Sequence, residues 1–106
     1  MITIHLYYKG SNGSARAFAE EMEHTGIADA IQAEKGNLRY QYYLPLNDPE
    51  TVLLIDSWID QSAIDAHHAS PMMERLAALR EKYDLHMTVE RFVREDIGTD
   101  EQFIRR

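Results

Sequence analysis

The stretch NLRYQYYLPLNDPETVLLIDSWI, residues 37–59, decides the fold of this 106-residue chain. Residues 37–44 and 51–59 are rich in aromatic and branched apolar side chains that alternate along the chain, which is typical of β-strands. Residues 45–50, PLNDPE, lie between them and consist mostly of turn-forming residues. A short turn between two such strands predicts an antiparallel hairpin.

Every second side chain of each hairpin strand points to the same face of the sheet. The predicted inner face consists of Leu38, Tyr40, Tyr42 and Leu44 on one strand, and of Val52, Leu54, Asp56 and Trp58 on the other. A carboxylate beside Leu54 and Trp58 is poorly solvated and needs a partner. Asp56 is therefore either a pocket acid with an aromatic wall, or a strand residue bonded to an arginine or a backbone N–H.

Outward from the hairpin, the preceding residues predict a strand and then a helix. Residues 2–9, ITIHLYYK, alternate as a half-buried strand. Apolar residues then recur at helical spacing from Ala15 to Ile31 and predict one amphipathic helix of about five turns, loosened near Gly26. Gly36 is expected to end this helix.

The residues after the hairpin predict a helix in two pieces and a last strand. Asp60 to Ser62 are expected to cap a short helix over residues 62–69. Ser70-Pro71 interrupts it, and Pro71 suits the start of the second piece. Residues 84–94 alternate as a fourth strand, and residues 96–106 form a mostly polar tail.

These elements predict a single α+β domain of the ferredoxin-like β-α-β-β-α-β type, with an antiparallel sheet. We assign residues 1–95 to the domain and residues 96–106 to a C-terminal tail, which is either loose or an arm that reaches a dimer partner. Helices on one face of a single sheet leave its other face bare. A chain of 106 residues also has a thin core. Both considerations predict a homodimer.

Composition narrows the classes of function. Hydrophobic residues make up 44% of the chain, so it is expected to fold, and no apolar run approaches the ~20 residues of a membrane span. The net charge of −7 argues against nucleic acid as a partner. The absence of cysteine removes disulfides and thiolate metal sites. The N-terminus carries no secretion signal, so we expect a cytoplasmic protein without metal or membrane partner.

Two adjacent histidines, His67 and His68, are the first candidates for chemistry in the sequence. Neighbouring helix positions point about 100° apart, so the pair does not readily chelate one metal ion. One of them is either a general acid or base in a pocket, or both are ordinary residues at a helix end.

Tyrosines and methionines offer a binding surface, with a structural alternative in each case. Tyr7, Tyr8, Tyr40, Tyr42 and Tyr43 would suit an aromatic ligand, but tyrosine is also common in strands. The pair Met72-Met73 would suit an adaptable pocket or plain helix packing.

The segment from residue 34 to residue 76 resembles the antibiotic biosynthesis monooxygenase family. The matching features occur in register: Gly36, Leu38-Arg39-Tyr40, Asp56-x-Trp58, Ala63-Ile64-Asp65-Ala66-His67 and Ser70-Pro71. They cover residues 35–75, and the flanking strands and first helix agree in order and length.

The resemblance implies a dimeric α+β barrel, in which two ferredoxin-like sheets pack face to face, and a pocket in each subunit between sheet and helices. Family oxygenases attack quinols or polycyclic phenols with O₂ and use no metal, flavin or haem, so no cofactor is expected. The protein then has to deprotonate and orient its aromatic substrate and exclude water.

On this resemblance His67 is expected to accept a proton, Trp58 to form a pocket wall, and Asp56 to orient a neighbour. The expected substrate-binding residues are Tyr40, Tyr42, Arg39 and Met72.

Two positions depart from the family pattern. Leu54 stands where oxygenating members often carry Asn, and Asp56 stands where Glu is usual. The leading prediction is a cofactor-independent monooxygenase of a small aromatic or quinol-type substrate. The alternatives are an isomerase of a small carbonyl compound, with Arg39 or Arg75 supplying charge for a phosphate, and a non-catalytic ligand-binding dimer.

Overall fold

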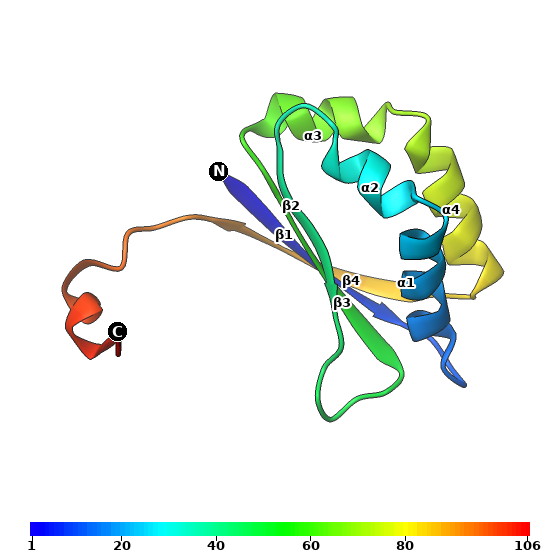
Figure 1. Cartoon of the computed structure of the whole chain (residues 1–106), viewed down its shortest axis with the longest axis horizontal. Coiled ribbons are helices and arrows are strands. Elements are labelled where there is room, and N and C mark those ends of the chain that lie inside the picture. The colour runs from blue at the N-terminus through cyan, green and yellow to red at the C-terminus, as the bar shows by residue number, and fades with distance from the viewer.

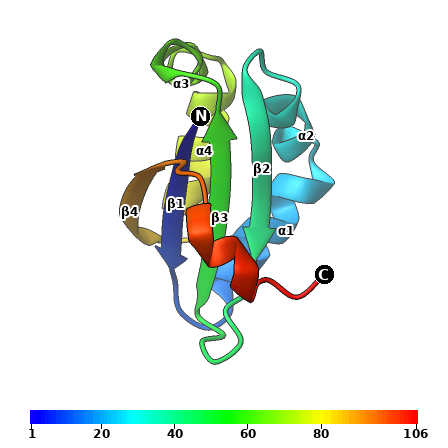
Figure 2. The same cartoon turned by 90° about the vertical axis from the view of Figure 1, so that its left-hand side faces the viewer.

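A computed structural model describes residues 1–106 and contains one four-stranded antiparallel sheet with the long helices on one side (Figure 1). The strands are β1 (Ile2–Lys9), β2 (Asn37–Tyr43), β3 (Thr51–Trp58) and β4 (His86–Val93). They lie in the order β2-β3-β1-β4, which can be followed in Figure 2. The predicted α+β class and order of elements are confirmed.

The helices are α1 (Ser14–His24), α2 (Ile27–Gln32), α3 (Gln61–His68) and α4 (Met72–Lys82). Prediction of a single helix up to Ile31 was wrong, because Gly26 has a φ of 80° and separates α1 from α2. A right-handed helix cannot continue through a left-handed residue. Asp60 caps α3 as predicted, and its side chain accepts a hydrogen bond from the backbone N–H of Ala63.

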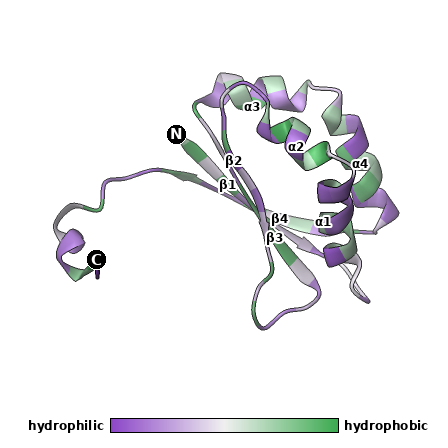
Figure 3. Ribbon diagram, in the orientation of Figure 1, coloured by the Kyte–Doolittle hydropathy of each residue, from purple (hydrophilic) through white to green (hydrophobic).

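The core lies between the sheet and the helices. Its largest fully buried side chains are Trp58, Tyr8, Phe18, Met22, Ile31, Leu54 and Leu76. β1 is central to it, because Leu6 is paired with Leu54 of β3 on one side and with Val89 of β4 on the other. The alternate hydrophobic and hydrophilic bands of the helices in Figure 3 reflect their amphipathic packing on the sheet.

The predicted inner face of β2 was wrong for its two leucines. The pairing of β2 with β3 shifts by one residue between Asn37 and Arg39, so Leu38 lies in a bulge and is 54% exposed. Leu44 follows the end of the strand and is also exposed. Tyr40 and Tyr42 do point toward the helices.

The other face of the sheet, here called the open face, has no helix against it (Figure 1). Among its residues are Thr3, His5, Tyr7, Ile55, Ser57 and Phe92. His5 and Phe92 pack together with ring centroids 4.7 Å apart. This arrangement confirms that the helices share one face and leave the second face uncovered.

The C-terminal segment extends away from the body of the protein (Figure 1). It contains a short 3₁₀ helix, η1 (Gly98–Phe103), and the hydrogen bonds of its last turn and side chains stay within the segment. Phe103 is 80% exposed. None of the helices in the structure has the length and apolarity needed to cross a bilayer.

Candidate functional site

A cavity of about 320 Å³ lies between the inner face of the sheet and helices α3 and α4. Most of its lining is apolar, with side chains from all four strands and both helices. Its polar lining consists of Tyr40, Asp56, Gln61, His67, His68, Arg80 and Arg91. A mostly apolar cavity with a few convergent polar groups is the usual form of a small-molecule site.

The local structure explains how these side chains meet. Alternation along β3 points Leu54, Asp56 and Trp58 to the same face, toward the helices. The cap at Asp60 starts α3 directly after β3, which brings His67 over the end of that strand. His67 stacks on Trp58 with ring centroids 4.8 Å apart and planes 29° apart.

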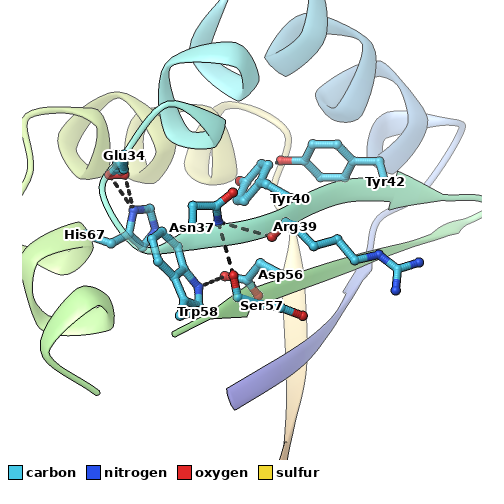
Figure 4. Close-up of polar contacts among 9 residues, drawn as sticks. All are labelled: Glu34, Asn37, Arg39, Tyr40, Tyr42, Asp56, Ser57, Trp58 and His67. Atoms are coloured by element: carbon cyan, nitrogen blue, oxygen red, sulfur yellow. Dashed lines mark hydrogen bonds and ion pairs between the residues drawn. The ribbon is translucent and has the colours of Figure 1, made fainter. Parts of the chain in front are cut away.

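Glu34, in the loop before β2, holds His67 in place. Both carboxylate oxygens of Glu34 lie 2.9 Å from Nδ1 of His67 (Figure 4). An ionised carboxylate only accepts hydrogen bonds, so Nδ1 carries the proton and donates it. Nε2 of His67 has no partner within the protein and is not among the fully buried atoms that lack one. It is therefore the free nitrogen of a buried ring.

Asp56 lies on the other side of Trp58. Its Oδ2 accepts a hydrogen bond of 2.8 Å from the indole Nε1 (Figure 4), and its Oδ1 is buried without any partner. Burial raises the pKa of Asp56, against the opposing effects of the Trp58 hydrogen bond and the charges of His67 and His68. Asp56 thus contributes to the cavity wall a carboxyl group that holds its proton more tightly than an ordinary aspartate.

The buried phenol of Tyr40 completes the inner wall, and the phenol of Tyr42 lies behind it. Tyr40 lines the cavity, and its hydroxyl lies 3.0 Å from that of Tyr42. Burial raises the pKa of both tyrosines far above the usual range, so both phenols remain protonated. Nε and Nη2 of Arg80 donate hydrogen bonds of 3.2 and 2.8 Å to the hydroxyl of Tyr8. Burial also raises the pKa of Tyr8.

The structure brings four of the seven predicted site residues together at this cavity: Asp56, Trp58, His67 and Tyr40. The other three lie outside its lining. Tyr42 lies behind Tyr40 and packs against Phe18. Arg39 is exposed on β2, beside Tyr43. Met72 packs against the core, and its neighbour Met73 lines the cavity instead. Arg75 is also exposed and outside the lining.

Four polar residues of the site were missed in the sequence: Glu34, Gln61, Arg80 and Arg91. Arg91 could have been found from the sequence, because it follows Met87 and Val89 at every second position and is the charged residue on that face of β4. Arg80 lies one helical turn after Leu76 on the buried side of α4. Nothing in the spacing of Glu34 pointed to His67, which is 33 residues away.

No group of three or more His, Asp or Glu side chains is arranged to hold a metal ion. This finding concerns the whole chain, since residues 1–106 are all described.

Comparison with solved structures shows the same fold in several bacterial proteins. A protein from Deinococcus radiodurans is 21% identical with a TM-score of 0.78, covering 91% of this chain and 94% of its own. PA3566 from Pseudomonas aeruginosa is 21% identical with a TM-score of 0.77, covering 90% and 94%. The N63A variant of SnoaB, a cofactor-independent oxygenase from Streptomyces nogalater, is 14% identical with a TM-score of 0.75, covering 92% and 96%.

At these identities the likeness establishes a shared fold. None of the curated proteins matches the sequence. The family model described as antibiotic biosynthesis monooxygenase matches residues 1–79, which include β1 to β3, the first three helices and most of α4. The chain therefore belongs to the antibiotic biosynthesis monooxygenase family.

Proposed function

We propose that this protein is a cofactor-independent monooxygenase that oxidises a small phenolic or quinol-type substrate with O₂ in the cavity between the sheet and α3 and α4. The observation that carries the proposal is the Glu34–His67 pair stacked on Trp58. It supplies a free imidazole nitrogen in a mostly apolar cavity of a size suited to a compound of one or two rings.

In the proposed reaction Nε2 of His67 removes the proton of the substrate hydroxyl. The phenolate that forms is electron-rich and reduces O₂, and a bond forms between a ring carbon and oxygen. Cleavage of the O–O bond with loss of the proton on that carbon then gives a quinone and water. The balance is one phenol and one O₂ consumed for one quinone and one water, with all the electrons supplied by the substrate.

Three other lining residues take part in this scheme. Trp58 forms a flat wall against which an aromatic ring can stack. Tyr40 keeps its proton and can donate a hydrogen bond to a substrate oxygen. Asp56 holds the indole of Trp58 through Oδ2, which fixes the orientation of this wall.

Oxygen uptake with a panel of quinols, beginning with menadiol, tests this function. Wild type should consume O₂, and His67→Ala should lower kcat by about 100-fold or more, in line with the loss of a general base. The matched control is His24→Ala, because His24 is exposed at the end of α1 and far from the cavity lining. Absence of uptake across the panel, or equal rates in both variants, would refute the proposal.

An isomerase of a small carbonyl compound is the second candidate, and the environment of Asp56 favours it. A carboxyl of raised pKa and a histidine with a free nitrogen line one cavity, which is the pair needed to move a proton between two atoms of a substrate. Exchange of a substrate α-proton in deuterated water, without consumption of O₂, would select this function. Tight ligand binding with neither activity would select a non-catalytic binding protein.

We also propose that the functional unit is a homodimer. The open face presents aromatic and aliphatic side chains without a covering layer, and the C-terminal segment leaves the body with Ile97 and Phe103 exposed. A second copy would cover both features, with residues 96–106 lying against the partner. Location in the cytoplasm stays a prediction.

A further inference from the structure

Two arginines line the cavity without a carboxylate partner. Arg80 projects from α4 and Arg91 from β4, and both are part of the lining. The ion pairs of the protein involve Arg16, His67, Lys82, His86 and Arg106, so neither cavity arginine belongs to one. The chain has 18 acidic residues and only 11 lysines and arginines, which makes two unpaired guanidinium groups at one site unexpected.

Most of the hydrogen-bonding capacity of these groups is unused. Nη2 of Arg91 donates a hydrogen bond of 2.5 Å to Oε1 of Gln61, and its side chain makes no other hydrogen bond within the protein. Arg80 donates from Nε and Nη2 to the hydroxyl of Tyr8. A guanidinium group has five N–H donors in a planar fork that matches the oxygens of a carboxylate or phosphate.

Packing alone accounts for Arg80 better than for Arg91. The guanidinium of Arg80 lies 5.4 Å from the ring centroid of Tyr8, a favourable cation–π contact for a half-buried charge. Arg91 has no such contact. It is exposed on the inner face of β4, where Met87 and Val89 are apolar, so its guanidinium is free to meet a ligand that enters the cavity.

The side chains that line the cavity carry more positive than negative charge, while Glu34 lies behind the lining and is paired with His67. Its fully ionised cations are Arg80 and Arg91, its one carboxyl is Asp56, and His67 and His68 are the remaining titratable groups apart from Tyr40. This local excess stands in a protein of net charge −7. A cationic lining within an acidic protein favours an anionic ligand at that place.

We propose that the substrate of this cavity carries an oxyanion group, a carboxylate or a phosphate ester, and that Arg91 binds it with electrostatic support from Arg80. The inference rests on the proposed function for the aromatic part of the substrate. The aromatic ring lies against Trp58 and His67, and the oxyanion group lies toward β4 and α4. Arg39 and Arg75, which the sequence suggested for phosphate, lie outside this cavity.

Binding measured by calorimetry without oxygen tests the inference separately from catalysis. The probes are 1-hydroxy-2-naphthoate, 1-naphthyl phosphate and the neutral analogue 2-methyl-1-naphthol. Wild type should bind at least one of the two anions about tenfold or more tightly than the neutral analogue, the effect of one charge-assisted contact. The tighter of the two anions identifies the oxyanion group as carboxylate or phosphate.

Variants at exposed arginines locate the contact. Arg91→Gln should lower the affinity for the preferred anion about tenfold and leave the neutral analogue unchanged, and Arg91→Lys should retain most of the affinity. Arg75→Gln is the matched control on the surface of α4 and should change neither. These variants remove exposed side chains, so folding is not at risk.

Several results would overturn the inference. They are equal affinity of wild type for neutral and anionic probes, an equal loss for both kinds of probe in Arg91→Gln, and no binding of any of the three compounds. Preference for the anion in a protein that consumes no O₂ with any quinol would leave this inference intact and remove the proposed oxidation.

Discussion

Glu34 determines which nitrogen of His67 is available for chemistry. Its two oxygens share the Nδ1 proton, and the ring is further held by stacking on Trp58. A buried imidazole that is fixed by a carboxylate on one side presents a basic nitrogen on the other. Glu34 is thus a positioning residue, acting on the substrate only through His67.

Glu34→Gln should lower kcat by about 100-fold, comparable to the loss of a general base. A side-chain amide can donate to Nδ1, which favours the tautomer with the proton on the nitrogen that must accept one. Oxygen uptake measures the rate, and the melting temperature with Trp58 fluorescence checks that the fold is retained. Glu34→Asp, which keeps an acceptor, should recover part of the rate. Equal activity of Glu34→Gln and wild type would contradict this role.

Asp56→Asn should stabilise the protein at high pH more than at low pH. Burial raises the pKa of Asp56 above its ordinary value of 3.8, so the folded state holds this proton more tightly than the unfolded state. The contribution of Asp56 to stability is therefore present below that value and is lost as the pH rises through the raised pKa. Asn is neutral at every pH and suffers no such loss.

Thermal unfolding at pH 4 and pH 8 measures this effect. The melting temperature of Asp56→Asn relative to wild type should be higher at pH 8 than at pH 4, by about 4–8 °C for each kcal/mol in a domain of this size. Asp29→Asn controls for the removal of one charge from an exposed helix position. A difference that is the same at both pH values would contradict the burial argument.

At the residue scale, the site residues that could be predicted from the sequence are those that lie on a strand or a helix. Asp56, Trp58, His67 and Tyr40 lie on strands or a helix whose alternation or spacing was readable. Glu34 lies in a loop, and loops follow no period, so its contact with His67 arises only in the folded chain.

Gly36 links the loop before β2 to helix α3. Its backbone has a φ of 85°, and a Cβ added there would lie 2.6 Å from the Cβ of Ala63. Its carbonyl oxygen also accepts a hydrogen bond of 2.9 Å from the N–H of Ile59. The close approach keeps the Glu34 loop next to the helix that carries His67.

Gly36→Ala should destabilise the protein more than Gly26→Ala. Both glycines are left-handed, which costs an alanine about 1–2 kcal/mol, but a Cβ at Gly26 would meet nothing within 4 Å. The overlap with Ala63 should add about 1–3 kcal/mol at Gly36. Urea unfolding of the two variants gives the difference in the free energy of unfolding. Equal destabilisation would show that α3 yields freely to the added methyl group.

At the element scale, prediction from sequence worked for types of element and failed where the backbone leaves its regular path. The sequence predicts only a loosened helix at Gly26, because a glycine inside a helix can be tolerated, whereas in the structure the helix ends there. The bulge at Leu38 could not be predicted, because this apolar residue continues the alternation of the sequence. In the structure it has no partner on β3, and the pairing of the two strands shifts there by one residue.

The molecule as a whole is one layer of helices on one sheet, with a large sheet face and a C-terminal segment left without contacts (Figures 1 and 2). Sequence analysis anticipated this architecture because both helical regions are amphipathic. It could not place the C-terminal segment, since residues 96–106 have few apolar residues and no period that would fix a contact.

Sedimentation equilibrium at micromolar concentration should show a dimer, because pairing of two open faces would bury their exposed side chains. Phe92→Glu places a charge on that face beside His5 and should weaken self-association about tenfold or more. Leu46→Glu is the matched control, since Leu46 is 98% exposed in the hairpin turn. A wild-type monomer under these conditions would count against the dimer.

The central position of β1 has a consequence for synthesis of the chain. Of the four strands of this sheet β1 is synthesised first, yet it pairs with β3, more than 40 residues later in the chain, and with β4 along its other edge. Contacts between such distant segments slow folding, and an unpaired strand is prone to aggregation meanwhile. The nascent chain should therefore have an incomplete sheet until translation has passed Val93. Until then Ile2–Lys9 should need a chaperone to keep it from aggregating.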